Sequence, residues 1–245
     1  MNGQSLDSTI LSLLRQPGGN EGLEAPAHWS RNLKGVSNSA KSPGRAYPDR
    51  LFETAPPLNA TTVAITATYT LRQFTSADAG IVAAWVDSAQ TRRWVSPSAS
   101  GPITADVVNE WLKPGGRAFV LTNRDVATPV GYGEINPMRS YRDHDWLGHL
   151  IVRPNERGRG IGRVLVVELL RHAFGERGVR KVSLVVFPGN LPAIRCYLAV
   201  GFHMRGEEFH RFGGSSRAHR LIHLQMDRDC FESMNPFGNV GASIG

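Results

Sequence analysis

The sequence predicts one mixed α/β (α+β) domain over residues 65–229, with a central, mostly antiparallel sheet flanked by helices. Several segments alternate apolar and polar residues, as strands with one buried face do. Others follow a capping residue and repeat apolar residues at helical spacing. The segment 181–187, "KVSLVVF", is apolar almost throughout, which is typical of a strand covered on both faces. Together these patterns predict the element order β-α-α-β-β-β-α-β-α-β-β.

The N-terminal half of the domain is expected to hold one strand, two helices and three further strands. Alternation in "TATYTLRQFT" predicts the first strand, and Thr75 then caps a helix with Asp78 in its first turn. That helix covers "SADAGIVAAWVDSA". A second helix, "ADVVNEWLK", follows Thr104 as its cap and ends before Pro114. The three strands are expected at 117–123, 129–136 and 145–152.

The C-terminal half is expected to begin with a long helix, "GRVLVVELLRHAFGER". Its apolar positions form one broad buried face, and Gly178 ends it. After the buried strand, a short helix runs from its cap, Asn190, to Gly201. Two final strands are expected at 202–212 and 219–227, joined by a glycine-rich turn.

Both ends of the chain differ in composition from this domain. Residues 16–60 are rich in Gly, Pro, Ser and Asn, with too few apolar side chains to offset the entropy of ordering. We therefore expect residues 1–64 to be a disordered extension, with a short helix near 7–15. The tail 230–245 is expected to be flexible for the same reason.

Charge and cysteine usage restrict the classes of partner. The 245 residues carry a formal charge of +7, and two cysteines occur, so anionic partners and a reducing compartment are favoured. No dense basic tract with interleaved aromatics is present, and nucleic acid is not expected as a partner. No apolar run approaches the roughly twenty residues of a membrane span, so we expect a cytoplasmic protein with no membrane partner.

A glycine-rich turn follows the predicted strand 145–152. In "ERGRGIGRVLVVELL", glycines at 158, 160 and 162 alternate with arginines and lead directly into a helix. Unpaired amides and the helix dipole make such a turn an anion site, and glycine lets a pyrophosphate approach the main chain. A Walker loop would need Gly-Lys-Ser/Thr, which is absent, and the Rossmann G-x-G-x-x-G has Arg163 at its last position.

Two motifs together resemble the GNAT family of N-acetyltransferases. "RGRGIG" fits the family's R/Q-x-x-G-x-G/A signature, at the same place between a strand and a helix. "NLPAIRCYLAVGF" is similar to the second motif, through Asn190, Ala193, Tyr197 and the pair Gly201-Phe202. The resemblance covers about residues 69–228. It implies a GNAT-like acyltransferase domain with acetyl-CoA as acyl donor.

The resemblance also implies where acetyl-CoA binds. The pyrophosphate would lie on the amides of the glycine turn, and the pantetheine arm would run along the splayed strand before it. Asn190 would reach the cofactor from the next junction of strand and helix. The implied contacts are Leu150, Ile151, Val152, Arg157, Gly158, Arg159, Gly160, Ile161, Gly162, Arg163 and Asn190.

Acyl transfer to an amine needs a proton donor for the departing thiolate and a base for the ammonium. Tyr197, placed near the sulfur by the resemblance, is the expected acid; the alternative is a packed core aromatic. Glu134 is the expected base, through water, because it shares a strand face with Tyr132 and small neighbours leave room for a ligand. The alternative is an exposed strand residue. His149 is a second candidate base, and Trp146 occupies the position where histone-type members of the family carry a glutamate.

Other polar residues are not expected to form a metal site. The turn Asp143–Trp146 offers too few ligands, and His219 and His223 share a strand face without a carboxylate or cysteine on that strand. Cys196 has no obvious base and is expected to pack in the core.

The expected function is acetyl-CoA-dependent N-acetyl transfer to a primary amine, by direct attack in a ternary complex. The acceptor is left open between a small-molecule amine and a protein N-terminus or lysine. A non-catalytic acyl-CoA-binding regulatory domain is the alternative from another class. The assembly state is also left open, a homodimer included.

Overall fold

The computed structural model describes residues 68–125, 127–138, 141–212 and 217–234, and these form one sheet with helices on both faces. The seven strands lie in the order β1-β2-β3-β4-β5-β7-β6. Only β4 and β5 run parallel; every other neighbouring pair is antiparallel. The expected mixed, mostly antiparallel sheet is therefore confirmed. The expected N-terminal extension and its short helix lie outside the described residues.

The strands agree closely with those expected from alternation. They are β1 (Tyr69–Gln73), β2 (Arg117–Asn123), β3 (Pro129–Pro137), β4 (His144–Val152), β5 (Lys181–Val186), β6 (His203–Arg211) and β7 (Ala218–Asp227). The helices are α4 (Ala79–Ala83), α5 (Ala89–Val95), α6 (Ala105–Trp111), α7 (Ile161–Arg171), α8 (Leu191–Val200) and α9 (Arg228–Met234), and a short π-type turn, His172–Glu176, extends α7.

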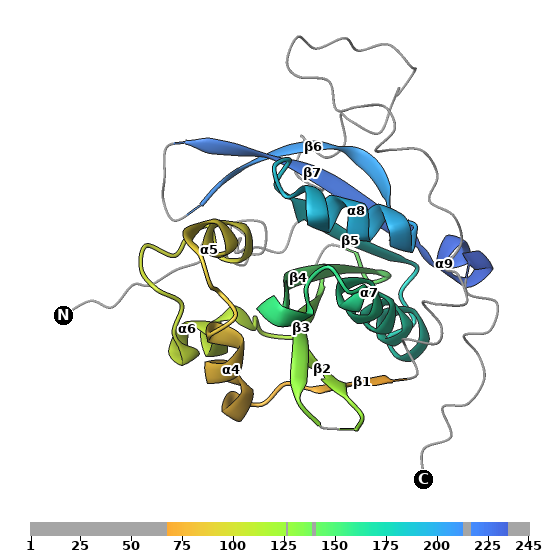
Figure 1. Ribbon diagram of the computed structural model, residues 1–245. Coiled ribbons are helices and arrows are strands. Elements are labelled where there is room, and N and C mark those ends of the chain that lie inside the picture. The colour runs from red at the N-terminus through yellow and green to blue at the C-terminus, as the bar shows by residue number, and fades with distance from the viewer. Residues whose placement is uncertain (1–67, 126, 139–140, 213–216, 235–245) are drawn as a thin grey trace.

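The helices divide between the two faces of the sheet (Figure 1). On one face α7 and α8 bury the larger core, which includes Leu165, Leu169 and Ile194. On the other, α4 and α6 bury a smaller core around Val82 and Trp111. Each face of the central strands is thus covered, which explains why β5 is apolar almost throughout.

The first helix is shorter than expected, and a second helix that was not expected follows it. A turn at Ser76–Asp78 leads into α4, and after a gap the helix α5 begins at Ala89. The Ser88 hydroxyl caps α5 by accepting the amide of Thr91 at 3.0 Å. A capping residue such as Ser88 starts a new helix. The segment after it, which was expected to be a loop, is therefore the helix α5, and it carries Trp94.

The strand β4 separates from β5 halfway along its length. The parallel pairing ends at Trp146 and Ser183, so the rest of β4 has no strand neighbour on that side. On its other side the register with β3 shifts between Tyr132 and Glu134, and His149 has a φ of 46°. A bulge of this kind bends and twists a strand, and here it opens the sheet where the glycine turn follows.

The helix α9 continues the fold beyond Asp229. Phe231 is 5% exposed and packs against Phe174, with ring centroids 5.3 Å apart. The first part of the segment expected to be a flexible tail is therefore helical, because one aromatic side chain fills a gap in the core. Residues 235–245 lie outside the described residues.

Candidate active site

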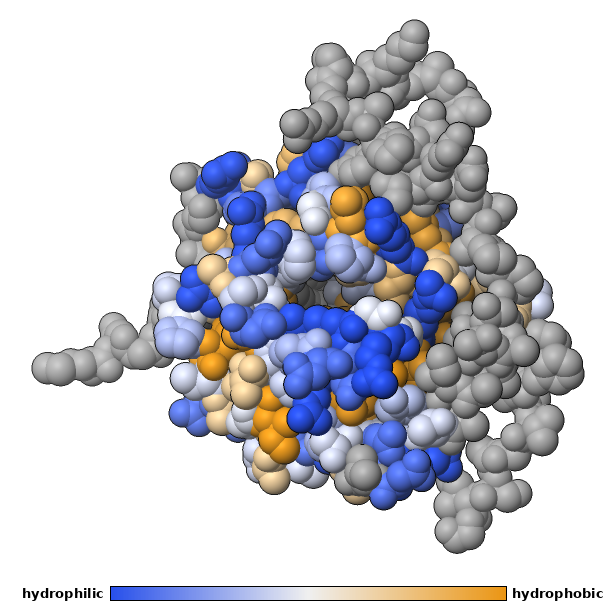
Figure 2. Space-filling view, in the orientation of Figure 1, coloured by the Kyte–Doolittle hydropathy of each residue, from blue (hydrophilic) through white to orange (hydrophobic). Residues whose placement is uncertain are grey.

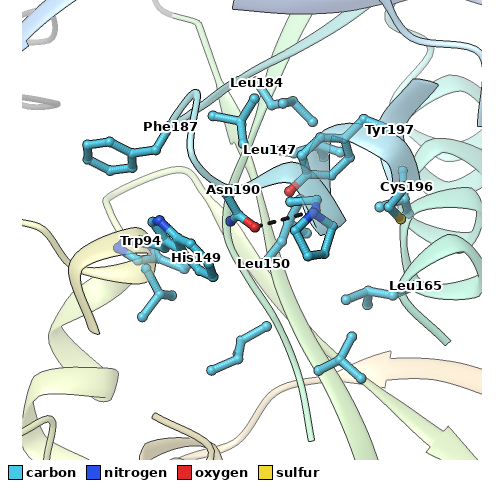
Figure 3. Close-up of a pocket in the computed structure, with 18 of the residues that line it drawn as sticks. Trp94, Leu147, His149, Leu150, Leu165, Leu184, Phe187, Asn190, Cys196 and Tyr197 are labelled. Atoms are coloured by element: carbon cyan, nitrogen blue, oxygen red, sulfur yellow. Dashed lines mark hydrogen bonds between the residues drawn. The ribbon is translucent and has the colours of Figure 1, made fainter. Parts of the chain in front are cut away.

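A cavity of about 630 Å³ occupies the space where β4 and β5 separate. Its walls come from β4, β5, α5, α7 and α8, together with the glycine turn that joins β4 to α7. Figure 2 shows a hollow near the middle of this face of the molecule, with hydrophilic residues along its rim. In Figure 3, Trp94, His149 and Phe187 lie to one side of the cavity, and Leu165, Cys196 and Tyr197 lie to the other.

The glycine turn presents a row of amides without protein acceptors. Gly158 and Gly160 have φ values of 76° and 85°, and Gly160 is the N-cap of α7. Within the described part of the chain, no acceptor is recorded for the amides from Gly158 to Gly162, whereas the Arg163 amide donates to the Gly160 carbonyl at 2.9 Å. Five consecutive amides at a helix N-terminus form an anion site.

The arginines of this turn have different environments. The Arg157 guanidinium donates to the Val152 carbonyl at 3.0 Å, the Trp85 carbonyl at 2.8 Å and the Asp87 carboxylate at 2.8 Å. It therefore ties the glycine turn to the segment after α4. Arg159 pairs with Glu156 at 2.9 Å, and Arg163 lines the cavity. Of the three, Arg163 is best placed to face a bound anion.

The free edge of β4 lines the cavity beside this turn. Leu150, Ile151 and Val152 all contribute to the wall. The Val152 carbonyl is already hydrogen-bonded to Arg157, which leaves the stretch before it as the open backbone edge. An extended ligand can add to such an edge as a further strand.

The start of α8 brings the second motif to the opposite wall. The Asn190 side chain accepts the Ala193 amide at 3.4 Å and so caps α8, at the cavity surface. Gly162 lets α7 approach α8 closely, because a Cβ there would lie 3.4 Å from the Cys196 sulfur. Burial raises the pKa of Cys196 to about 12, as expected of a packing thiol.

Tyr197 lies on α8 with its ring mostly buried and its hydroxyl directed to the middle of the cavity (Figure 3). Burial, with a smaller effect of Cys196, raises the pKa of Tyr197 above its ordinary value. No protein group among the described residues is recorded as a hydrogen-bond partner of this hydroxyl. The phenol is therefore neutral and able to donate to a ligand.

Glu134 and His149 form a buried polar pair behind the cavity wall. His149 lines the cavity, and its Nδ1 lies 3.0 Å from Glu134 Oε2. Tyr132 donates to the other Glu134 oxygen at 2.7 Å, which confirms that both side chains share one strand face. Trp111 stacks on the imidazole, with ring centroids 4.6 Å apart. The imidazole is thereby held in one orientation.

Glu134 itself is 1% exposed and does not line the cavity. Burial raises the pKa of Glu134, but the opposite effect of His149, Tyr132 and Asn136 together is larger. The pKa of Glu134 therefore lies below its ordinary value. The expected room beside Glu134 is filled by the protein, because Asn136 and His149 both contact its Oε2, at 3.3 and 3.0 Å, and a Cβ at Gly148 on the facing strand would lie 3.4 Å from the same atom. Glu134 is thus an ionised, enclosed carboxylate that reaches the cavity through His149.

Three aromatic residues of the cavity were missed by sequence reasoning. Trp94, Phe187 and Phe212 come from α5 and from the ends of β5 and β6. Periodicity carries no signal for them, since each lies in a segment that the sequence makes a loop or the end of an element. Trp146, noted for its position, lines the same cavity.

Two of the remaining histidines share one carboxylate. Glu208 on β6 lies 3.0 Å from His223 Nδ1 and 2.7 Å from His210 Nε2. His223 on β7 thus meets a carboxylate from the adjacent strand. In the part of the chain that the structure describes, no group of three metal-ligating side chains has the arrangement to hold a metal ion.

The sequence of this region matches a known family. The model of the acetyltransferase (GNAT) family covers residues 83–202, which contain both motifs and most of the cavity wall. The chain belongs to the GNAT family. It is accordingly an N-acetyltransferase, and acetyl-CoA is its acyl donor.

Two curated proteins illustrate the relationship. Aminoglycoside N(6')-acetyltransferase type 1 from Klebsiella pneumoniae is 26% identical over 155 residues, which cover 56% of this chain and 75% of that protein. A probable spermine N(1)-acetyltransferase from Bacillus subtilis subsp. natto is 29% identical over 62 residues, 25% of this chain and 41% of that protein.

Solved structures of GNAT enzymes share the fold. Spermidine N-acetyltransferase from Vibrio cholerae, in complex with CoA and spermine, has a TM-score of 0.56 at 19% identity and covers 67% of this chain and 98% of its own. An aminoglycoside acetyltransferase in complex with coenzyme A has a TM-score of 0.54 at 22% identity, with the same coverage. No helix among the described residues is long and apolar enough to cross a membrane.

Proposed function

We propose that this GNAT enzyme transfers the acetyl group of acetyl-CoA to a primary amine of a small molecule, by direct attack in a ternary complex. One observation carries the proposal. The open amides of residues 158–162, the free edge of β4 and the Tyr197 hydroxyl all meet at one cavity. A donor with a diphosphate, an extended arm and a thioester fits these three features in that order.

Placement of the donor follows from this geometry. The diphosphate binds the amides of the glycine turn, assisted by Arg163, and the arm lies along β4 at Leu150 and Ile151. The thioester then lies between Asn190 and Tyr197 on one wall and His149 on the other. A main-chain amide of β4 beside the bulge supplies the hydrogen bond for the developing oxyanion.

Tyr197 acts as the general acid for the thiolate. Its phenol is neutral because burial raises its pKa, and no other described residue competes for its proton. The thiolate needs this proton only as the carbon–sulfur bond breaks, so the interaction favours the transition state over the bound thioester.

His149 acts as the general base, with Glu134 as a positioning residue behind it. The Glu134 carboxylate favours the Nδ1–H tautomer, which leaves the lone pair of Nε2 for the ammonium proton. The same carboxylate stabilises the imidazolium that results. In this arrangement Glu134 serves the base through His149 and not through water.

The acceptor is a small-molecule amine and not a protein N-terminus or lysine. The named activities of the relatives, an aminoglycoside and a spermine acetyltransferase, support this class. A protein acceptor would instead need an open groove that runs past the thioester. The cavity described above is bounded by α5 at its outer end, which favours a compact acceptor.

Thiol release from acetyl-CoA across a panel of small amines and amino-terminal peptides tests the proposal. We expect turnover with small amines, and a loss of about a hundredfold in kcat for Tyr197→Phe with unchanged affinity for CoA. A regulatory acyl-CoA-binding domain would bind CoA without turnover with any amine. Unchanged kcat in Tyr197→Phe would contradict the assigned acid.

A further inference from the structure

The acceptor end of the cavity is lined by four large aromatic side chains. They are Trp94 on α5, Trp146 on β4, Phe187 after β5 and Phe212 after β6, and we call them the aromatic wall. Phe187 and Phe212 have ring centroids 6.0 Å apart, so two separate strand ends form one continuous apolar surface. In Figure 3, Trp94 and Phe187 lie on the same side of the cavity as His149.

Carboxylates are absent from the described lining of this cavity. The acidic groups behind and beside the wall are paired with other side chains, and Glu134 is paired with His149. Asp87 holds Arg157 and Thr91, and Glu208 accepts from His210 and His223. Burial raises the pKa of Glu208, but the hydrogen bonds and charges of these two histidines outweigh burial and bring the pKa to about 2. The Glu208 carboxylate is therefore ionised and paired with both histidines.

One cation lies directly against the aromatic wall. The Arg93 guanidinium lies over the Phe187 ring, 5.8 Å from its centroid. Burial, followed by Arg93 and Arg217, lowers the pKa of His219, whose ring lies 6.0 Å from that of Phe187, so the neutral imidazole is favoured there. The face of Phe187 is therefore already occupied by a cation.

This environment disfavours an acceptor with several ammonium groups. One ammonium is deprotonated at His149, but each further one would lose water and meet an apolar wall without a carboxylate. Aromatic faces attract cations by about 0.5–2 kcal/mol, yet the face of Phe187 already holds Arg93. The apolar body of an acceptor, in contrast, binds more favourably here, because its contact with the aromatic wall removes apolar surface from water.

We propose that the acceptor of this enzyme carries a single amine on an aromatic or aliphatic body, neutral or anionic at its far end, and that the aromatic wall determines this choice. The inference rests on the proposed acetyl transfer and names its substrate class. It sets this chain apart from relatives whose names specify polycationic acceptors.

Three amines of equal chain length provide the first test. Pentylamine, aminovalerate and cadaverine end in a methyl, a carboxylate and an ammonium group, and differ in little else. We expect kcat/KM for cadaverine to be at least about tenfold below that for pentylamine, with aminovalerate equal to pentylamine or better. Phenylethylamine should exceed all three. A kcat/KM for cadaverine equal to or above that for pentylamine would overturn the inference.

A pair of phenylalanines provides a matched control. Phe212 is 8% exposed and lines the cavity, whereas Phe209, on the same hairpin, is 70% exposed and lies outside the cavity lining. Phe212→Ala should lower kcat/KM for phenylethylamine about tenfold and leave the KM for acetyl-CoA unchanged. Phe209→Ala should change neither. Equal effects of the two variants would contradict a role of the wall in acceptor choice.

Binding measurements separate this inference from the proposed function. The CoA-saturated protein is titrated with phenylethylamine and with cadaverine, and intrinsic tryptophan fluorescence or calorimetry reports the complex. Tighter binding of phenylethylamine supports the role of the aromatic wall in acceptor choice. If no thiol is released although phenylethylamine binds more tightly, only the proposed acetyl transfer fails. Tighter binding of cadaverine, or no binding of either amine, overturns the inference.

Discussion

At the scale of single residues, the site depends on a histidine held in an uncommon conformation. His149 has a φ of 46°, a left-handed conformation that a residue with a side chain adopts rarely. The bulge in β4, the Trp111 ring and the Glu134 carboxylate together hold it there. Such strain persists when the surroundings fix the residue, and it is common at functional sites.

Removal of the charge behind His149 should weaken the base. For Glu134→Gln we expect kcat to fall about tenfold to a hundredfold, and the acidic limb of the kcat–pH profile to move to lower pH. The ionised Glu134, whose pKa is lowered partly by His149, favours a protonated imidazole, and a neutral amide does not. A pH–rate series with saturating acetyl-CoA measures both changes.

Tyr132→Phe is the control for this experiment. It removes the 2.7 Å hydrogen bond to Glu134 but leaves the carboxylate charged. The acidic limb of the kcat–pH profile of Tyr132→Phe should stay at the pH of the parent. The midpoint of its thermal unfolding should report any general loss of structure. An unmoved acidic limb in Glu134→Gln would show that Glu134 does not act through His149.

At the scale of elements, we propose that the start of α7 binds the diphosphate of the donor. Gly160 caps this helix at a φ of 85°, where a side chain costs about 1–2 kcal/mol and turns the neighbouring amides. Gly160→Ala should therefore weaken CoA binding about tenfold in an equilibrium titration. Gly80→Ala in α4, where a Cβ meets nothing within 4 Å, should leave CoA binding unchanged. Equal affinity in both variants would exclude the glycine turn as the diphosphate site.

An ion pair at the start of α4 should make the free energy of unfolding depend on pH in the acidic range. Asp78 accepts two bonds from Arg72, at 2.7 and 2.8 Å, and one from the Thr75 amide at 2.9 Å. The Arg72 bonds, against the effect of burial, lower the pKa of Asp78 from 3.8 to about 2. Because the folded pKa is depressed, the stabilisation is complete above the unfolded pKa and is lost as the pH falls through the folded one.

Asp78→Asn should therefore lower the free energy of unfolding by about 1–2 kcal/mol at neutral pH, and the difference from the parent should shrink as the pH falls from 4 toward 2. Urea unfolding at several pH values measures this. A difference that stays constant over that range would mean that the charge of Asp78 is not its source.

At the scale of the whole molecule, α9 closes the core that supports the cavity. Phe231 packs against Phe174, and Arg228 donates to the carbonyls of Val179 and Phe174. Phe231→Ala should lower the free energy of unfolding by about 3–5 kcal/mol. Phe209→Ala, at an exposed site, should lower it far less, and comparable losses in chemical unfolding would contradict the assigned packing.

Much of the fold could be predicted because its signals are local. Alternation located β2 at 117–123, and Thr75, Thr104 and Asn190 marked the starts of helical segments in agreement with the structure. The early end of α4 was missed because apolar residues continue to Val86, and the helix α5 was missed because "AQTRRWV" has no apolar repeat. The helix α9 was missed because a single buried aromatic leaves no periodic pattern.

The site was predictable in part, for the same reason. The glycine turn and the α8 motif are short segments whose spacing implies their chemistry, and the structure brings both to one cavity. Glu134 was expected to face a ligand, but a strand pattern gives only the face of the sheet and not the neighbours across it. Those neighbours, Gly148 and His149, come from another strand, beside its bulge.

The sequence by itself determined the family and the acyl donor, and it predicted the helix that we propose binds the diphosphate, because each depends on residues close together in the chain. Only the tertiary structure decided which groups meet at the other end of the cavity. Trp94, Phe187 and Phe212 are far apart in sequence, and meet because β4 parts from β5 and α5 lies across the opening. Long-range packing, which no local pattern encodes, therefore forms the surface that we propose selects the amine.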